Sequence, residues 1–269
     1  MNITVVFKKS VYQHCLDKYG SVTRKNCYDY DRVCSSHKEQ QKTLELVKKL
    51  LPDAKVLPSE KVNKPFKEQD LIIAVGGDGT GIKTLHYVKN TPFLLVNSDI
   101  SASEGALAQC NRFNFEERLN MFKKGKYKIE EWTRLKTTVN GKELPSAINE
   151  VFIGAKVAYL TSRYFINGEE HKSSGLIVST GTGSTAWYSS CGGKPFPKDA
   201  KYGKFIAREV YTGALHKPKL IEGKTPVKIT SKMFDGIVAI DAIQEFKIER
   251  GAKIEIDVSD TPARMVVFK

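Results

Sequence analysis

Three short segments combine residue types that could bind a phosphorylated ligand. The first is Gly76-Gly77-Asp78-Gly79-Thr80-Gly81, which follows an apolar run and precedes a helical stretch. Glycines let the backbone approach a ligand closely, and free N–H groups at a helix start bind phosphate. Because a carboxylate in such a loop repels phosphate unless it accepts a proton or binds Mg²⁺, Asp78 indicates phosphoryl chemistry. A tight turn with Asp78 as an ordinary helix cap is the alternative interpretation. The segment matches neither the Walker A nor the dinucleotide glycine pattern.

The second segment, Ser179-Thr180-Gly181-Thr182-Gly183-Ser184-Thr185-Ala186-Trp187, follows the apolar run 176–178. Its glycines and alanine fit Gly-x-Gly-x-x-Ala, but the dinucleotide fingerprint also needs an acid at the end of the next strand, about 20 residues on. Asp199 instead lies in a Lys- and Pro-rich stretch that reads as a loop. The segment therefore predicts a polar, close-approach pocket wall, with a Ser/Thr-rich surface loop as the alternative.

The third segment is Asn149-Glu150, directly before the apolar run 151–153. Neighbouring residues on a strand face opposite sides, so both side chains can reach one ligand only at a strand end or a bulge. On its own this pair is equally well explained as one exposed and one buried polar residue.

Patterns in the first 125 residues predict the elements of an α/β domain with a parallel sheet. Apolar runs predict strands, and helical spacing follows the capping box Ser36-x-x-Glu39 as far as Pro52. A further helix is expected between Asn114 and Gly125. The other expected elements are strands at 3–7, 71–75 and 93–96 and a helix at 80–89.

From about residue 126 to 269 the sequence predicts antiparallel β structure. Asn140-Gly141, Asn167-Gly168 and Asp235-Gly236 are dipeptides that close two-residue hairpins, and segments 238–242 and 254–258 alternate in polarity. We therefore expect two domains, at 1–125 and 126–269. The tail, from about residue 250, is expected to be able to pack back onto the first domain.

The composition of the chain limits the kinds of molecule that we expect it to bind. The chain has 269 residues with 43 Lys and Arg against 30 Asp and Glu, a net charge of +13. Such an excess suits anionic partners, but the basic residues are dispersed without interleaved aromatic residues, so nucleic acid is not expected. No apolar run is long enough for a membrane span, so none is expected. The polar stretch after residue 7 also argues against a signal peptide. Five cysteines without CxxC spacing predict free thiols, no zinc site and a cytoplasmic protein.

Together and in this order, the three segments resemble the ATP-NAD kinase family. The first segment alone also resembles diacylglycerol- and sphingosine-type lipid kinases. Asn97-Ser98-Asp99, Ser103-Glu104-Gly105 and Ser173-Ser174-Gly175 are similar to the mitochondrial-type branch of the family. The common bacterial pattern has Asp where Ser174 stands and Tyr where Trp187 stands. The missing carboxylate at Ser174 leaves one family contact to the dinucleotide without its usual residue.

The resemblance implies a Rossmann-like α/β domain, a β-rich domain and a nucleotide site in the cleft between them. It implies transfer of the γ-phosphoryl group of ATP, with Mg²⁺ or another divalent cation, to the 2′-hydroxyl of the adenosine ribose of NAD. Asp78 would be the catalytic residue, and no residue is assigned as a metal ligand. The resemblance also implies a homo-oligomer, most simply a dimer. The alternative functions are those of a lipid kinase that shares the first segment and of a non-catalytic dinucleotide-binding sensor. The residues implied to bind nucleotide are Gly76, Gly77, Gly79, Thr80, Asn149, Glu150, Thr182, Thr185, Ala186, Trp187 and Ser190.

Overall fold

The computed structural model describes residues 1–211 and 221–268, and these divide into two compact units. The first unit contains residues up to Glu130 together with the C-terminal segment from Arg264. The second unit runs from Glu131 to Ala263. The division therefore falls five residues later than expected, and only the last residues of the chain, from Arg264 rather than from about residue 250, belong with the first unit. No helix among the described residues is long and apolar enough to cross a membrane.

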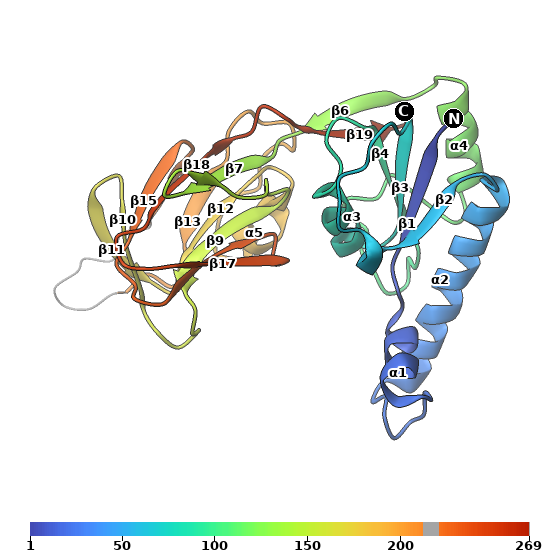
Figure 1. Cartoon of the computed structure of the whole chain (residues 1–269), viewed down its shortest axis with the longest axis horizontal. Helices are drawn as coiled ribbons and strands as arrows, with labels where there is room; N and C mark the ends of the chain where they lie inside the picture. Colours follow the sequence, from blue (N-terminus) through green and yellow to red (C-terminus); the bar gives the residue numbers. More distant parts are fainter. Residues whose placement is uncertain (212–220, 269) are drawn as a thin grey trace. The chain divides into compact units, whose positions relative to one another are not determined.

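The first unit is a sheet flanked by helices, as the sequence predicts (Figure 1). Its strand order is β2-β1-β3-β4-β19-β6, and β5 pairs with β4. The pairings of β1, β2, β3, β4 and β5 are parallel, and β19 also joins β4 in parallel. The strands are β1 (Ile3–Phe7), β2 (Lys55–Pro58), β3 (Leu71–Gly76), β4 (Phe93–Asn97), β5 (Cys110–Asn111), β6 (Lys128–Trp132) and β19 (Ala263–Val267).

Helices cover both faces of this sheet. Alternate residues of β3 and β4 pack with side chains of α2 and α4 in one core cluster, while Gly81 of α3 approaches Leu95, whose neighbours Leu94 and Val96 point into that cluster. Because successive strand residues point to opposite faces, α3 covers the other side. Figure 1 shows α3 on one side of the strands and α2 and α4 on the other. The helices are α1 (Val11–Tyr19), α2 (Tyr30–Leu50), α3 (Asp78–Leu85) and α4 (Phe115–Lys123), with a 3₁₀ turn at Ser59–Lys61.

Two helix boundaries differ from the sequence prediction. The capping box at Ser36 is wrong, because α2 already begins at Tyr30 and the Ser36 hydroxyl accepts a hydrogen bond from Gln40 Nε2 inside the helix. The third helix begins at Asp78 rather than at residue 80, since Gly77 is its N-cap. The predicted helix from Asn114 to Gly125 is confirmed, with Gly125 in the left-handed region at φ +70°.

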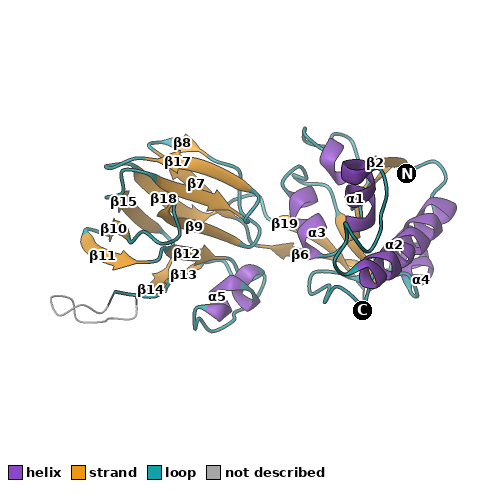
Figure 2. Cartoon of the chain, turned by 90° about the horizontal axis from the view of Figure 1, so that it is seen from below, coloured by secondary structure: helices purple, strands orange, loops and turns teal. Residues whose placement is uncertain are grey.

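The second unit is a sandwich of two antiparallel sheets (Figure 2). One sheet has the order β11-β10-β15-β18-β7-β8 and the other β14-β13-β12-β9-β16-β17. Residues of both, such as Tyr164 and Ile254 of the first and Val151 and Val178 of the second, form one buried core cluster. The first sheet comprises β7 (Leu135–Val139), β8 (Lys142–Glu143), β10 (Ser162–Ile166), β11 (Glu169–Ser173), β15 (Val227–Ser231) and β18 (Lys253–Val258). The second comprises β9 (Glu150–Ala155), β12 (Leu176–Ser179), β13 (Lys204–Ala207), β14 (Glu222–Lys224), β16 (Gly236–Ile240) and β17 (Gln244–Ile248).

Two of the three predicted hairpin turns are confirmed. Asn140-Gly141 joins the paired strands β7 and β8, and Asn167-Gly168 joins β10 and β11. The hairpin predicted at Asp235-Gly236 is wrong, because Gly236 is the first residue of β16 and the preceding strand, β15, belongs to the other sheet. This segment instead crosses the sandwich, and the backbone carbonyl of the exposed Asp235 accepts a hydrogen bond from Lys156 N at 3.1 Å.

Candidate functional site

The glycine-rich segment is the turn from β3 into α3. Gly76 ends the fully buried strand, and a side chain there would overlap that of Thr80. Gly77 approaches Ser103, whose Oγ would lie 2.7 Å from a Cβ. These two glycines are therefore explained by packing inside the protein. Gly79 differs, because it is exposed and a Cβ added to it would meet nothing within 4 Å.

Asp78 lies in the first turn of α3 and is half-buried. Its carboxylate connects α3 to the loop that follows β4: Oδ2 accepts a hydrogen bond from Ala106 N at 3.0 Å and Oδ1 accepts one from Leu107 N at 2.9 Å. A carboxylate has about four acceptor positions, so two such bonds fix its orientation and leave lone pairs for a ligand. The geometry suits a group that accepts a hydrogen bond from a hydroxyl.

The loop after β4 is shaped by Asn97, at the end of that strand. Asn97 Nδ2 donates to the Ser103 carbonyl at 3.0 Å, and its Oδ1 accepts from Asp99 N at 3.1 Å. Gly105, at φ +61°, lies against the Asn97 amide, where a side chain has no room. Burial opposes ionisation of Asp99, but hydrogen bonds such as those from Ser101 hold its pKa below the ordinary value. These interactions position the amides that bind Asp78.

Asn149 and Glu150 lie at a strand end, the arrangement in which neighbouring side chains can serve one ligand. Glu150 is the first residue of β9 and stands opposite Ser179, the last residue of β12. The chain after β12 binds the pair directly: Thr180 N donates to the Asn149 carbonyl at 2.9 Å. Thr180 Oγ1 donates to the Ile148 carbonyl at 2.6 Å. The structure therefore joins the second and third sequence segments in one site within the second unit.

Two buried polar atoms of this site have no hydrogen-bond partner among the described residues. They are Asn149 Oδ1 and Thr182 Oγ1. Gly183, next to Thr182, packs on the backbone of Asn149. Seven buried side-chain atoms of the described residues lack a partner, and these two lie in neighbouring segments, where a polar ligand or a water molecule would satisfy both.

Asp241 is a functional candidate that the sequence did not indicate. It lies in the turn between β16 and β17 and is 6% exposed. Its carboxylate accepts hydrogen bonds from the amides of Ile148, Asn149 and Glu150, at 2.7, 2.7 and 3.0 Å. Burial and the neighbouring Asp241 raise the pKa of Glu150 to about 7. Burial also lowers the pKa of Arg134 to about 10, although the charge of Asp241 opposes that shift.

The turn that presents Asp241 has an unfavourable backbone conformation. Asp241 and Ala242 have φ of +52° and +53°, in the left-handed region. That region costs an alanine roughly 1–2 kcal/mol, whereas glycine adopts it freely. We expect Ala242→Gly to raise the free energy of unfolding by about 1 kcal/mol in urea titrations followed by fluorescence. Both tryptophans, Trp132 and Trp187, lie in this unit, so the signal reports on it. Ala158→Gly, at an exposed position without positive φ, is the control and should not stabilise the unit.

The remaining predicted residues lie on the exposed side of the same segment. Thr185 and Ala186 are exposed, and Trp187 stacks on Phe152 with ring centroids 5.3 Å apart. The Arg208 guanidinium lies 5.0 Å from the Trp187 ring centroid, which adds a cation that sequence reasoning missed. Ser190 is exposed, and its Oγ donates to the Ala186 carbonyl at 3.3 Å. Trp187 therefore forms a stacked aromatic wall, whereas the Ser190 hydroxyl stabilises its own short helix.

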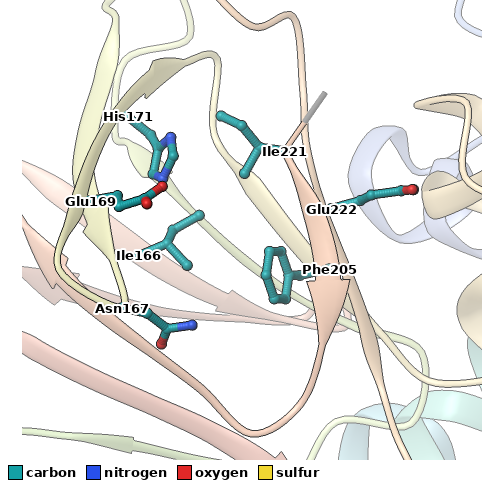
Figure 3. A pocket seen from close by; sticks show the side chains of 7 residues that line it. All are labelled: Ile166, Asn167, Glu169, His171, Phe205, Ile221 and Glu222. Carbon is teal, nitrogen blue, oxygen red and sulfur yellow. The ribbon is translucent and has the colours of Figure 1, made fainter. Parts of the chain in front are cut away.

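A separate cavity of about 290 Å³ lies among β10, β11, β13 and β14 of the second unit (Figure 3). Three apolar side chains line it together with two carboxylates, an amide and an imidazole. None of the residues from the three sequence segments lines it. Its lining residues are Ile166, Asn167, Glu169, His171, Phe205, Ile221 and Glu222.

The glycine-rich strand–helix turn of the α/β unit and the polar site of the β-sandwich are features that nucleotide-binding proteins share. The chain belongs to the NAD kinase family: it is 31% identical over 210 residues to the NAD kinase of Thermoplasma volcanium, covering 74% of each chain. No family model matches the chain.

Two solved structures share the fold of the whole chain. One is an NAD kinase from Archaeoglobus fulgidus in complex with ATP, at a TM-score of 0.68 and 21% identity, covering 100% of this chain and 94% of that one. The other is yeast NADH kinase complexed with NADH, at a TM-score of 0.71 and 15% identity, covering 100% and 84%. These likenesses confirm the predicted combination of an α/β domain with a β-rich domain.

Proposed function

We propose that this protein is an NAD kinase that transfers the γ-phosphoryl group of ATP to the 2′-hydroxyl of the adenosine ribose of NAD, forming NADP. Two observations carry the proposal. Asn149 Oδ1 and Thr182 Oγ1 are buried without a hydrogen-bond partner among the described residues, and Asp78 lies in the glycine-rich turn at the start of α3. Family membership supports the same reaction. A ribose offers paired donors and acceptors that suit an amide, a hydroxyl and a carboxylate.

In this proposal Asp78 accepts the hydrogen bond of the 2′-hydroxyl and takes its proton during transfer. Phosphoryl transfer mainly requires aligned reactants and neutralised charge, so a fixed acceptor contributes by position as well as by basicity. The two amides that bind Asp78 hold its carboxylate in one orientation. The Thr80 and Gly81 amides already donate to the Gly77 carbonyl, so the Asp78 and Gly79 amides in the first turn of α3 would be the ones that bind phosphate oxygens.

The second unit would bind the dinucleotide. Asn149, Glu150 and Thr182 contact the adenosine, Thr185 and Ala186 line the same pocket, and Trp187 is its wall. Ser190 has the weakest support, because its hydroxyl already bonds within its own helix. The structurally similar yeast NADH kinase is complexed with NADH, so NADH is the second acceptor to test.

A divalent cation, Mg²⁺ for preference, is expected to act with ATP. The described residues contain no group of three or more His, Cys, Asp or Glu side chains that could hold a metal ion. Asp78 supplies an oxygen donor of the kind that Mg²⁺ prefers, and phosphate oxygens supply others. When bound, the cation neutralises charge that develops on the phosphates.

Purified protein with NAD, ATP and Mg²⁺, read by an NADP-specific dehydrogenase, tests the proposed activity. NADP should form, and EDTA or heat treatment should abolish it. Replacing NAD by NADH, or ATP by polyphosphate, determines the acceptor and donor. A diacylglycerol or sphingosine acceptor should give no product. Absence of NADP above the heat-treated control, or phosphorylation of a lipid, would contradict the proposal.

Two further expectations concern the protein in the cell. The five described cysteines are free thiols, which suits a reducing compartment, so we propose a cytoplasmic location. We also propose a homo-oligomer, most simply a dimer, as the resemblance implies. Light scattering of the purified protein measures this state directly.

Gly79→Ala should separate stability from activity. A methyl group at this exposed position of α3 meets no protein atom within 4 Å, and alanine favours a helix over glycine by about 1 kcal/mol. The variant should therefore melt at a higher temperature. The methyl group occupies the space in which phosphate would approach the backbone, so turnover should fall at least about tenfold. Thermal unfolding and the NADP assay on the same sample measure both. A stabilised variant with normal turnover would exclude close approach of phosphate at Gly79.

A further inference from the structure

The Asp241 carboxylate holds three consecutive backbone amides, although it lies far from them in the sequence. One oxygen accepts from Ile148 N, and the other accepts from both Asn149 N and Glu150 N, all within 3.0 Å. On the opposite side of this backbone, the Thr180 amide and hydroxyl bind the carbonyls of Asn149 and Ile148. The backbone of the Asn149–Glu150 pair is therefore fixed from two loops at once.

The same carboxylate places a second negative charge beside Glu150. Glu150 is 7% and Asp241 6% exposed, so their charges are poorly screened by water. Arg134, which is 5% exposed and precedes β7, is a further charged group that interacts with Asp241. Burial and the Asp241 charge together raise the pKa of Glu150 to about 7. Glu150 consequently titrates close to neutral pH.

We propose that Asp241 is a positioning residue for dinucleotide binding, which fixes the Asn149–Glu150 backbone and sets the pH at which Glu150 becomes a charged acceptor for the ribose. The inference rests on the proposed NAD kinase function and deepens it. The turn adopts its left-handed conformation at Asp241 and Ala242 without a glycine, which costs stability and directs the carboxylate at the three amides.

The expected direction follows from the charge of Glu150. A carboxylate accepts hydrogen bonds from ribose hydroxyls more strongly than a neutral carboxyl group does. Below pH 7 Glu150 is mostly protonated, so only a fraction of the protein carries the strong acceptor. The Kd for NAD should therefore increase about tenfold between pH 8 and pH 6, because the apparent Kd scales inversely with the competent fraction.

Calorimetric titration of NAD from pH 6 to 8.5 tests this role without turnover. The wild type should show a midpoint near pH 7, and Glu150→Gln should abolish the pH dependence. Asp241→Asn removes the neighbouring charge, so its midpoint should move to lower pH while affinity falls at every pH. Asp235→Asn, at an exposed carboxylate of the same unit, is the matched control and should leave both unchanged.

The outcomes distinguish this inference from the proposed function. If the wild type forms NADP but Asp241→Asn weakens NAD binding equally at all pH values, Asp241 is only structural and the inference is wrong. If Asp241→Asn does not fold, the wild type and Glu150→Gln still decide: a pH profile that is flat in the wild type, or retained in Glu150→Gln, overturns it. A wild type that neither binds NAD nor forms NADP overturns the proposed function itself.

Discussion

Asp78→Asn should lower the turnover number for NADP formation by at least about 100-fold, the usual contribution of a general base. Asparagine has nearly the shape of aspartate but cannot take a proton from the 2′-hydroxyl. Its oxygen can retain one of the bonds from Ala106 and Leu107, while its NH₂ group faces the other amide. The main effect should therefore fall on kcat, and displacement of the loop should appear separately as a higher KM.

Steady-state assays with NAD and ATP varied in turn measure both effects. Asp53→Asn, at an exposed carboxylate of the same unit, is the control for loss of one charge and should keep the wild-type rate. Circular dichroism should show that both variants fold. A folded Asp78→Asn protein with near-normal turnover would show that Asp78 does not act as the base.

Short contiguous patterns in the sequence were sufficient to predict the central strands of the first unit and the division into an α/β part and a β-rich part. The apolar runs at 71–75 and 93–96 are fully buried parallel strands, because a central strand covered by helices on both faces must be apolar throughout. The start of α2 was missed, since its first turns are mostly polar and Val33 is their one buried residue. The Ser36-x-x-Glu39 pattern can also occur inside a helix, and here the Ser36 hydroxyl accepts a hydrogen bond from Gln40 within α2.

The site was predictable only where its residues form short motifs. Asn149, Glu150 and Thr182 belong to such motifs, and the structure brings them together through the pairing of β9 with β12. Asp241 carries no such signal, because 93 residues separate it from Ile148 and only the sheet order places β16 beside β9. An isolated aspartate before an alanine also does not indicate a left-handed turn. Contacts of this kind require the topology to be known.

Gly183→Ala should lower both stability and NAD affinity strongly. Gly183 lies where the 179–187 segment packs against the Asn149–Glu150 segment. A Cβ at Gly183 would lie 2.6 Å from the Asn149 carbonyl carbon and 2.8 Å from its Cα. These are backbone atoms held by Thr180 and Asp241, so no rotation of a side chain relieves the overlap. Forcing a methyl group into such a contact costs typically about 1–3 kcal/mol of unfolding free energy.

The same substitution should weaken NAD binding at least about tenfold, or more than 1.4 kcal/mol. The backbone must move apart, and that movement shifts Asn149 Oδ1 relative to Thr182 Oγ1, the two buried atoms of this site that have no hydrogen-bond partner among the described residues. Urea unfolding followed by tryptophan fluorescence and calorimetry with NAD measure the two effects. Gly79→Ala adds the same methyl group where no atom lies within 4 Å, and it should not destabilise the protein. Normal NAD affinity in a folded Gly183→Ala protein would mean that the dinucleotide does not bridge these motifs, because a ligand held by both atoms cannot tolerate their separation.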